Sequence, residues 1–228
     1  NSCEYMDNCG VCEGNNDTCI SDIDGNVYET VQIGEQVWMA ENLKVTHYSN
    51  GDEIPTGYSN SEWANLSTGA YAVYNNNESH ADTYGYLYNW YAVDDSRGIC
   101  PEDWHVPTDD EIKQLEIYLG MSQEEADDTG WRGTNEGSKL AGRADLWNGG
   151  ALENNPEFGT SGFTGLPGGY RYNYDGNYNG MGSRGSLWSS TEYSNSSAWG
   201  RLLYYSYSGI YRYYGSKRDG FSVRCVRD

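Results

Sequence analysis

The sequence predicts an α+β protein in which short helices precede a C-terminal antiparallel β meander. Three observations predict this class: four of the six cysteines lie in residues 1–20, one clear amphipathic helix pattern follows Thr108, and aromatic runs alternate with glycine turns in residues 198–228. With 228 residues, the chain is long enough to bury a core. We therefore divide it into a cysteine-rich head, residues 1–20, and one globular domain, residues 21–228.

Disulfides are expected to hold the head together, because it contains too few apolar side chains to form a core. Its cysteines follow the spacing C-x5-C-x2-C-x6-C and are Cys3, Cys9, Cys12 and Cys19. A zinc knuckle is the alternative, since C-x2-C suits tetrahedral thiolate ligation. The outer spacings and the Asn, Asp and Gly filler favour a disulfide clasp. An even total of six cysteines indicates an oxidising compartment, so we expect a secreted or cell-surface protein.

The first segment of the domain, residues 22–43, predicts a β-hairpin with its turn at Gly34-Glu35. Three polar residues in D-x-D-x-N spacing open it: Asp22, Asp24 and Asn26. This spacing resembles the start of a calcium loop, but the glycine is at the fourth position instead of the sixth, and the acidic residue expected at the twelfth is missing. We therefore expect a solvated β-turn there. Residues 45–85 are expected to form a long surface excursion.

The strongest helix signal follows Thr108, which can cap the helix. Glu111 completes a capping box with Thr108, and Gly120 ends the helix. The apolar residues expected to share its buried face are Ile112, Leu115, Tyr118 and Leu119.

Shorter elements are expected in the rest of the chain. A second helix is predicted from Ser122, with Glu125 closing its capping box, and a further helical turn near residues 138–143. From residue 147 the chain predicts loops and short strands. Glycine turns then separate three strands of a terminal meander, residues 198–206, 210–215 and 221–227.

Charge and hydropathy exclude two classes of partner. The net charge of −20 opposes binding to nucleic acid or to an anionic membrane surface. The charge is uneven: residues 163–228 carry eight Lys and Arg against four Asp and Glu, or +4, which leaves six against thirty, or −24, for residues 1–162. No apolar run is long enough to predict membrane insertion. The chain lacks a signal-like start, so we expect a mature or excised piece.

No catalytic or metal constellation is recognisable in the sequence. His47, His80 and His105 are far apart, and none has a second His or Cys at ligand spacing. A nucleophile elbow, a P-loop and a dinucleotide fingerprint are all missing. We therefore expect a protein that is not an enzyme and holds no metal or cofactor, with calcium in the head as the open alternative.

The last segment is dense in tyrosine. Side chains alternate between the two faces of a strand, so some of these phenols must point outward. Tyrosine with Ser, Gly and Asn is also the composition of antibody paratopes. We therefore predict a ligand-binding surface formed by Asn195, Trp199, Arg201, Tyr204, Tyr205, Tyr207, Tyr211, Arg212, Tyr213 and Tyr214. The alternative is that the tyrosines only stabilise the sheet through cross-strand pairs or belong to the core.

Seven motifs in one collinear series closely resemble the Fibrobacter succinogenes major paralogous domain, over residues 21–228. They are VWMAENL (37–43), GYLYNWYAV (85–93), GICP (98–101), WHVPTDDE (104–111), GLPGGYR (165–171), WSSTE (188–192) and GFSVRCVRD (220–228). The head, with DNCGVCEGNNDTC, resembles the short cysteine-rich linkers of secreted multidomain proteins.

The resemblance implies an extracellular bacterial domain of C-type-lectin-like fold, related to formylglycine-generating enzymes and similar to the variable proteins of diversity-generating retroelements. In those variable proteins the C-terminal meander carries the ligand-binding face, which corresponds to residues 195–214 here. The resemblance also implies a disulfide between Cys100 and Cys225. The scaffold residues that it implies are Trp188, Phe221, Val223 and Cys225.

Two departures limit what the resemblance implies. The E-P-N, Q-P-D and W-N-D motifs of calcium-dependent lectins are replaced by GLPGG and LWNGG, and Cys225 stands alone where the formylglycine-generating enzymes need two cysteines. The expected function is therefore recognition or adhesion, with a glycan or protein ligand on an external surface. Two alternatives stay open: a structural subunit or spacer of a surface filament, which would bind copies of itself, and a formylglycine-generating-type oxidase.

Overall fold

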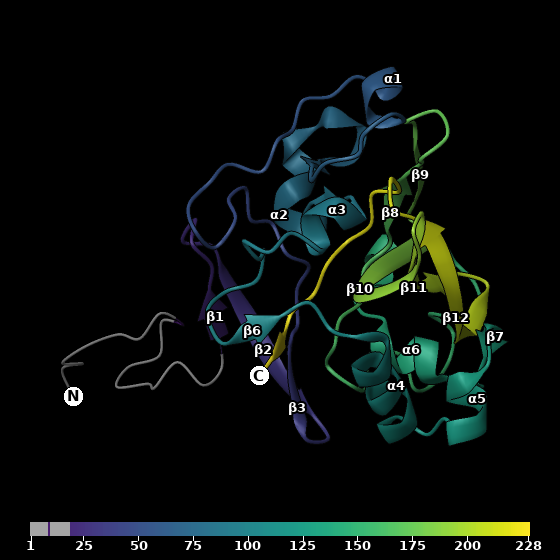
Figure 1. Ribbon diagram of the computed structural model, residues 1–228. Coiled ribbons are helices and arrows are strands. Elements are labelled where there is room, and N and C mark those ends of the chain that lie inside the picture. The colour runs from purple at the N-terminus through teal and green to yellow at the C-terminus, as the bar shows by residue number, and fades with distance from the viewer. Residues whose placement is uncertain (1–8, 10–18) are drawn as a thin grey trace, which may run out of the picture.

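The computed structural model describes Cys9 and residues 19–228, and within them it is a mixed α+β structure of many strands and short helices (Figure 1). The strands of one sheet are, in spatial order, β1 (Cys19–Ser21), β2 (Val27–Ile33), β3 (Gln36–Met39), β13 (Val226–Arg227) and β6 (Trp104–His105). Those of a larger sheet are β7 (Gly130–Arg132), β12 (Tyr207–Ser216), β11 (Ser197–Tyr204), β10 (Arg184–Ser194), β8 (Gly168–Arg171) and β9 (Tyr178–Met181). A small pair is formed by β4 (Tyr71–Ala72) and β5 (Leu87–Tyr88). The predicted α+β class is confirmed.

The helices form two groups, α1 to α3 in the upper half of Figure 1 and α4 to α6 in the lower half. They are α1 (Asn60–Trp63), α2 (Ala81–Tyr84), α3 (Trp90–Val93), α4 (Asp109–Tyr118), α5 (Gln123–Asp127) and α6 (Glu136–Leu140). Short 3-10 turns are η1 (Tyr74–Asn76), η2 (Glu78–His80) and η3 (Ala144–Leu146). In the part of the chain that the structure describes, every helix is too short or too polar to span a bilayer.

Local signals placed the first elements correctly. The hairpin of β2 and β3 turns at Gly34-Glu35, where Gly34 has a φ of 64°. At its start the carboxylate of Asp22 accepts the backbone N–H groups of Asp24 and Asn26, at 3.0 Å each. These bonds form the expected turn in place of a calcium loop.

Both predicted capping boxes are present, Thr108 with Glu111 before α4 and Ser122 with Glu125 before α5. The predicted buried face of α4 is wrong at Tyr118, which is 65% exposed. Its ring instead lies against Gly34 at the tip of the hairpin. The inward stripe of α4 contains two acidic residues in addition to its aliphatic side chains: Asp109, Ile112, Leu115 and Glu116 are buried.

The prediction that residues 221–227 form the third strand of the meander is wrong. Residues 221–227 leave the larger sheet after β12 and cross to the other one, where β13 lies between β3 and β6 (Figure 1). The meander consists of β10, β11 and β12 instead, paired antiparallel in that order. Glycine and serine at the start of β10 hid this strand from sequence reasoning.

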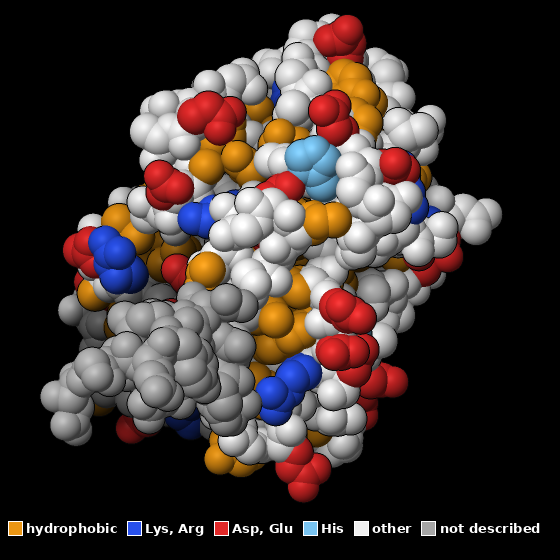
Figure 2. All heavy atoms as spheres, turned by 90° about the vertical axis from the view of Figure 1, so that its left-hand side faces the viewer, with side chains coloured by type: hydrophobic (Ala, Val, Ile, Leu, Met, Phe, Trp, Pro, Cys, Tyr) orange, Lys and Arg blue, Asp and Glu red, His pale blue; other side chains and the backbone are white. Residues whose placement is uncertain are grey.

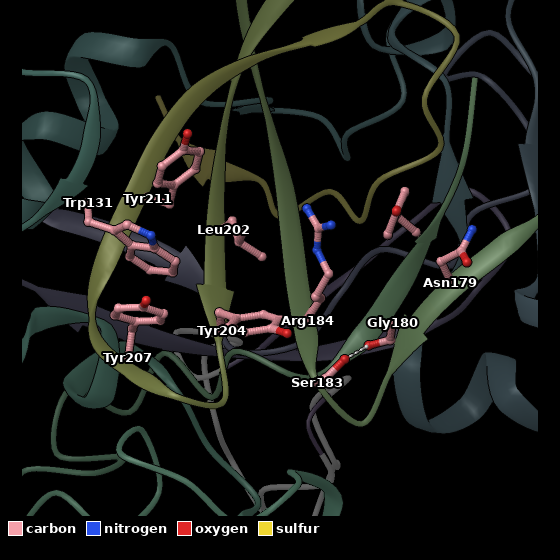
Figure 3. Close-up of a pocket in the computed structure, with 10 residues that line it drawn as sticks. Trp131, Asn179, Gly180, Ser183, Arg184, Leu202, Tyr204, Tyr207 and Tyr211 are labelled. Atoms are coloured by element: carbon pink, nitrogen blue, oxygen red, sulfur yellow. Dashed lines mark hydrogen bonds between the residues drawn. The ribbon is translucent and has the colours of Figure 1, made fainter. Parts of the chain in front are cut away.

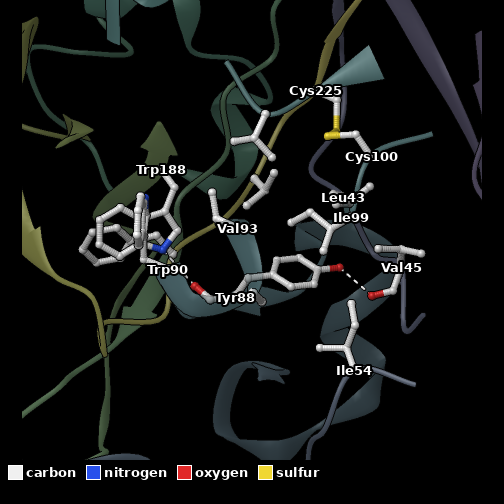
Figure 4. Close-up of a cluster of buried hydrophobic side chains, with 14 of the residues drawn as sticks. Leu43, Val45, Ile54, Tyr88, Trp90, Val93, Ile99, Cys100, Trp188 and Cys225 are labelled. Atoms are coloured by element: carbon white, nitrogen blue, oxygen red, sulfur yellow. Dashed lines mark hydrogen bonds between the residues drawn. A yellow bond between two sulfur atoms is a disulfide. The ribbon is translucent and has the colours of Figure 1, made fainter. Parts of the chain in front are cut away.

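A cluster of buried aromatic side chains fixes this crossing (Figure 4). The indole N–H of Trp188 donates to the carbonyl of Tyr88, and that of Trp90 to the carbonyl of Ser189, both at 2.9 Å. The Tyr88 hydroxyl donates to the carbonyl of Val45 at 2.7 Å. Buried rings thus have partners for their polar tips. The residues that the resemblance implied as scaffold are all buried: Trp188, Phe221, Val223 and Cys225.

Disulfides link parts of the chain as expected. Cys100 bonds Cys225 across 125 residues, which confirms the implied pairing. Cys9 bonds Cys19, so the zinc knuckle is wrong for these two thiols. Cys3 and Cys12 lie outside the described residues.

The face that carries β1 to β3 shows how the acidic charge is distributed. Figure 2 shows its acidic side chains scattered among polar and apolar ones, with fewer basic groups between them. On this face the acidic side chains are not gathered into one patch.

His105 joins the end of the chain to α4, and it should make stability depend on pH. Its Nδ1 bonds the carboxylate of Asp228, and its Nε2 lies 2.8 Å from Oε1 of Glu111. Burial works against the charged ring, but these hydrogen bonds raise the pKa of His105 above its ordinary 6.5. The native state therefore binds the proton more tightly than the unfolded state.

The stabilisation by protonated His105 is expected to be complete below pH 6.5 and to be lost as pH rises through its native pKa. Melting temperatures of the wild type and of His105→Gln, taken between about pH 5 and about pH 9, would measure it. The difference between the two proteins should shrink with rising pH. It should be modest, because the ring is 36% exposed. A pH-independent difference would contradict this assignment.

Candidate functional site

The register of β11 and β12 sorts the predicted binding residues onto two faces. Arg201 lies opposite Arg212, and Leu202 lies opposite Tyr211. Because neighbouring side chains in a strand point to opposite faces, the two arginines share one face, and Leu202 and Tyr211 share the other. The predicted tyrosine surface is therefore not a single continuous patch.

A shallow groove of about 550 Å³ lies over the Leu202 face of the sheet (Figure 3). Its aromatic lining consists of Trp131, Tyr170, Tyr204, Tyr207 and Tyr211. Its polar side chains are Asn179, Ser183 and Arg184. Figure 3 shows Trp131, Tyr207 and Tyr211 on one side and Asn179 and Gly180 on the opposite side, with Leu202 and Arg184 between them. We call this feature the aromatic groove.

Three neighbouring rings, two of them stacked, form one wall of the aromatic groove. The rings of Trp131 and Tyr207 are nearly parallel, with centroids 4.2 Å apart and an interplanar angle of 18°. Tyr211 lies on the same wall, 5.1 Å from Trp131. Trp131 and Tyr207 keep 40% and 48% of their surface exposed. The wall thus presents a large, rigid aromatic surface to solvent.

Sequence reasoning missed Trp131. It lies in β7, a three-residue strand that pairs with β12 so that Trp131 is opposite Tyr211. Nothing in its local sequence, TGWRGT, indicates a strand. The pairing of segments eighty residues apart depends on the whole fold, so a single sequence contains little signal for it.

Arg201 and Arg212 do not belong to the exposed surface, and this prediction is wrong. Arg201 donates from Nε to Glu116 at 2.6 Å and from Nη1 to Asp109 at 2.7 Å. Arg212 binds Asp109 from Nη2 at 2.7 Å, and Arg132 binds Glu116 from Nη2 at 2.7 Å. Burial opposes ionisation of Asp109, but the hydrogen bonds and charges of the two arginines lower its pKa to about 2. These ion pairs join α4 to the face of the sheet opposite the aromatic groove.

Tyr213 and Tyr205 also lie outside the groove. Tyr213 packs beneath it, with its ring 5.9 Å from that of Phe221, and burial raises the pKa of its hydroxyl. Tyr205 packs against the core on the α6 side of the sheet. Both are partly buried and neither lines the aromatic groove.

A second aromatic cluster lies on the Arg212 face. Tyr193 and Tyr214 stack at 4.0 Å with an angle of 6°, and Trp199 meets both rings edge-on. The guanidinium of Arg212 lies 3.8 Å from the centre of the Trp199 ring. Asn195 is exposed in the turn between β10 and β11. The predicted set therefore contributes three side chains to the aromatic groove: Tyr204, Tyr207 and Tyr211.

Groups that could hold a metal or supply a nucleophile were sought among Cys9 and residues 19–228. No three His, Cys, Asp or Glu side chains gather there in a way that could hold a metal ion. The cysteines in these residues are all disulfide-bonded, Cys225 included. Cys225, the one cysteine near the C-terminal end of the domain, is thus half of a disulfide.

Comparison with known proteins identifies the family of the chain. A family model described as the Fibrobacter succinogenes major domain matches residues 31–227. No significant match was found among curated proteins or among solved structures. The matched range includes every residue that lines the aromatic groove. The chain therefore belongs to the Fibrobacter succinogenes major domain family of bacterial domains.

Proposed function

We propose that this protein is an extracellular recognition domain, not an enzyme, which binds a glycan or a protein ligand in the aromatic groove. One observation carries the proposal: the groove presents a wall of aromatic rings that stay partly exposed to solvent. Trp131 and Tyr207 are 40% and 48% exposed, and the tyrosines of the lining add hydroxyl groups to this surface. Aromatic surfaces with polar tips are typical of binding sites.

The chemistry of the lining also favours binding over bond-making. The described residues that line the groove include no carboxylate, imidazole or thiol, so its hydroxyl groups have no neighbouring base there to activate them as nucleophiles. What the lining offers is flat contact area, hydroxyl groups, one amide and one guanidinium. These are the groups that hold a ligand in place.

Fold and location extend the proposal. We infer a C-type-lectin-like fold, as the family resemblance implies, and display on the outside of the cell. The two disulfides support an oxidising compartment, because such bonds are rare where thiols are kept reduced. On this view the partner is a glycan or a protein on an external surface.

Removing two rings of the aromatic wall should weaken binding. For a ligand found on glycan or protein arrays, the double variant Tyr207→Ala with Tyr211→Ala is expected to bind at least about tenfold more weakly, because it removes two contact rings and their hydroxyls. Tyr118→Ala is the matched control, since Tyr118 is an exposed tyrosine on α4, outside the groove. Equal affinity of the double variant and the wild type would place the ligand elsewhere, for example on the second aromatic cluster.

A further inference from the structure

The aromatic groove carries a charge opposite in sign to that of the whole protein. The chain has 34 acidic against 14 basic residues, yet the only charged side chain among the described residues that line the groove is Arg184. The segment that builds most of the groove, residues 163–228, has a net charge of +4, from eight basic and four acidic residues. A ligand that entered the groove would therefore meet a local positive charge.

Arg184 lacks the partners that the neighbouring arginines have. Its guanidinium lies 4.4 Å from the centre of the Tyr170 ring, and its Nε is buried without a hydrogen-bond acceptor in the described part of the chain. Arg201 and Arg212, on adjacent strands, are both bound by carboxylates. Among the described residues Arg184 has no carboxylate partner and is only half-buried as a residue, so its guanidinium can still pair with an anion that enters the groove.

Asp219 is an acidic residue near Arg184, and the positive charge of Arg184 acts to lower its pKa. Its oxygens are already occupied: Oδ1 accepts the backbone and side-chain N–H groups of Asn173, and Oδ2 accepts the backbone N–H of Ser216. Asp219 is also buried, and burial raises its pKa. Asp219 therefore does not take the place of an anionic ligand at Arg184.

The position of the groove favours a saccharide over a peptide. Peptides that bind a sheet usually pair their backbone with an exposed strand edge. The aromatic groove runs across the face of the sheet, and the strands at its centre, β10, β11 and β12, are already paired with one another. A ligand there meets mostly side chains: ring surface, tyrosine hydroxyls, the Ser183 hydroxyl, the Asn179 amide and the Arg184 guanidinium. A sugar ring, with an apolar face and a rim of hydroxyl groups, complements such a lining.

We propose that the aromatic groove binds an acidic saccharide. The sugar ring packs on the wall of Trp131, Tyr207 and Tyr211, and the carboxylate or sulfate of the sugar accepts charge-assisted hydrogen bonds from Arg184. This inference rests on the proposed function and names the class of ligand that the groove selects.

The test compares the affinities of acidic and neutral saccharides and of an acidic peptide. Calorimetric titration would use a uronic-acid trisaccharide, the same trisaccharide with its carboxylates reduced to alcohols, a sulfated trisaccharide and an acidic peptide. The proteins would be the wild type, Arg184→Gln and Arg143→Gln. Arg143 is the matched control, because it is an exposed arginine, paired with Asp145 outside the groove.

The wild type is expected to bind at least one acidic trisaccharide about tenfold or more tightly than the neutral one. Arg184→Gln should remove this difference in affinity. Arg143→Gln should retain it. The tighter of the two acidic trisaccharides identifies the anionic group. If Arg184→Gln does not fold, the comparison of acidic and neutral trisaccharides on the wild type decides alone.

Three results would overturn the inference. Equal affinity of the wild type for acidic and neutral trisaccharides would show that Arg184 does not select an anion. The proposed function, ligand binding in the groove, would still stand. Binding of the acidic peptide without any saccharide would make the ligand class wrong. Acid-selective binding that survives in Tyr207→Ala with Tyr211→Ala would move the site out of the groove, which is also the failure of the proposed function.

Discussion

Replacing Glu116 with alanine is expected to lower the free energy of unfolding by about 3–5 kcal/mol, because it leaves charged groups buried without their counterion. Glu116 is fully buried on α4 and binds two guanidinium groups, those of Arg132 and Arg201. Arg201 keeps Asp109 in the variant, whereas Arg132 loses its only carboxylate among the described residues. Urea unfolding, followed by tryptophan fluorescence, would measure the loss.

A second substitution tests the cause. If the unpaired charge is responsible, adding Arg132→Met to Glu116→Ala should restore part of the stability, since it removes that charge and keeps an apolar stem in place. Arg143→Ala breaks an exposed pair with Asp145 and should leave the unfolding curve unchanged. An unfolding midpoint for Glu116→Ala equal to that of the wild type would show that the buried pairs do not support the fold.

Removing the disulfide between Cys100 and Cys225 is the other change with a large expected effect. The bond closes a loop of 125 residues, and loop-closure entropy for such a length amounts to about 4–5 kcal/mol of stabilisation. The double variant Cys100→Ala with Cys225→Ala should therefore melt at a much lower temperature than the oxidised wild type. Calorimetry of the double variant and of the oxidised wild type would measure this difference; reductant added to the wild type breaks the Cys9–Cys19 bond as well.

The matched control is the double variant Cys9→Ala with Cys19→Ala. This bond spans only ten residues and ties the head to β1, so its removal should have a smaller effect on the melting of the domain. Equal melting temperatures for the oxidised and the reduced wild type would contradict the stabilising role of the longer loop. Similar losses for the two double variants would show that loop length does not decide the effect.

Local chemistry explains why some elements were predictable. Each capping box needs only four consecutive residues, and both were found where Thr108 and Ser122 predict them. The hairpin turn at Gly34-Glu35 is local in the same way. By contrast, the place of β13 depends on contacts with β3 and β6, which lie more than a hundred residues earlier in the chain. Sequence pattern alone could not supply these contacts.

The candidate site shows the same division. A tyrosine-rich sheet with some outward rings was predictable from strand alternation, but the direction of each ring was not. Arg201 and Arg212 face inward because α4 presents Asp109 and Glu116 to them. One signal was available: Asp109 and Glu116 lie seven residues apart, on the same stripe of α4 as Ile112, so the helix pattern itself placed two acids inward. Charged residues on an apolar stripe predict buried cationic partners.

The position of β13 has a consequence for how this sheet folds. β13 separates β3 from β6, so the facing edges of these two strands stay unpaired until residues 226–227 are in place. Open strand edges can pair wrongly during that time. Folding of this sheet should therefore be slow, since its closing contacts join distant segments.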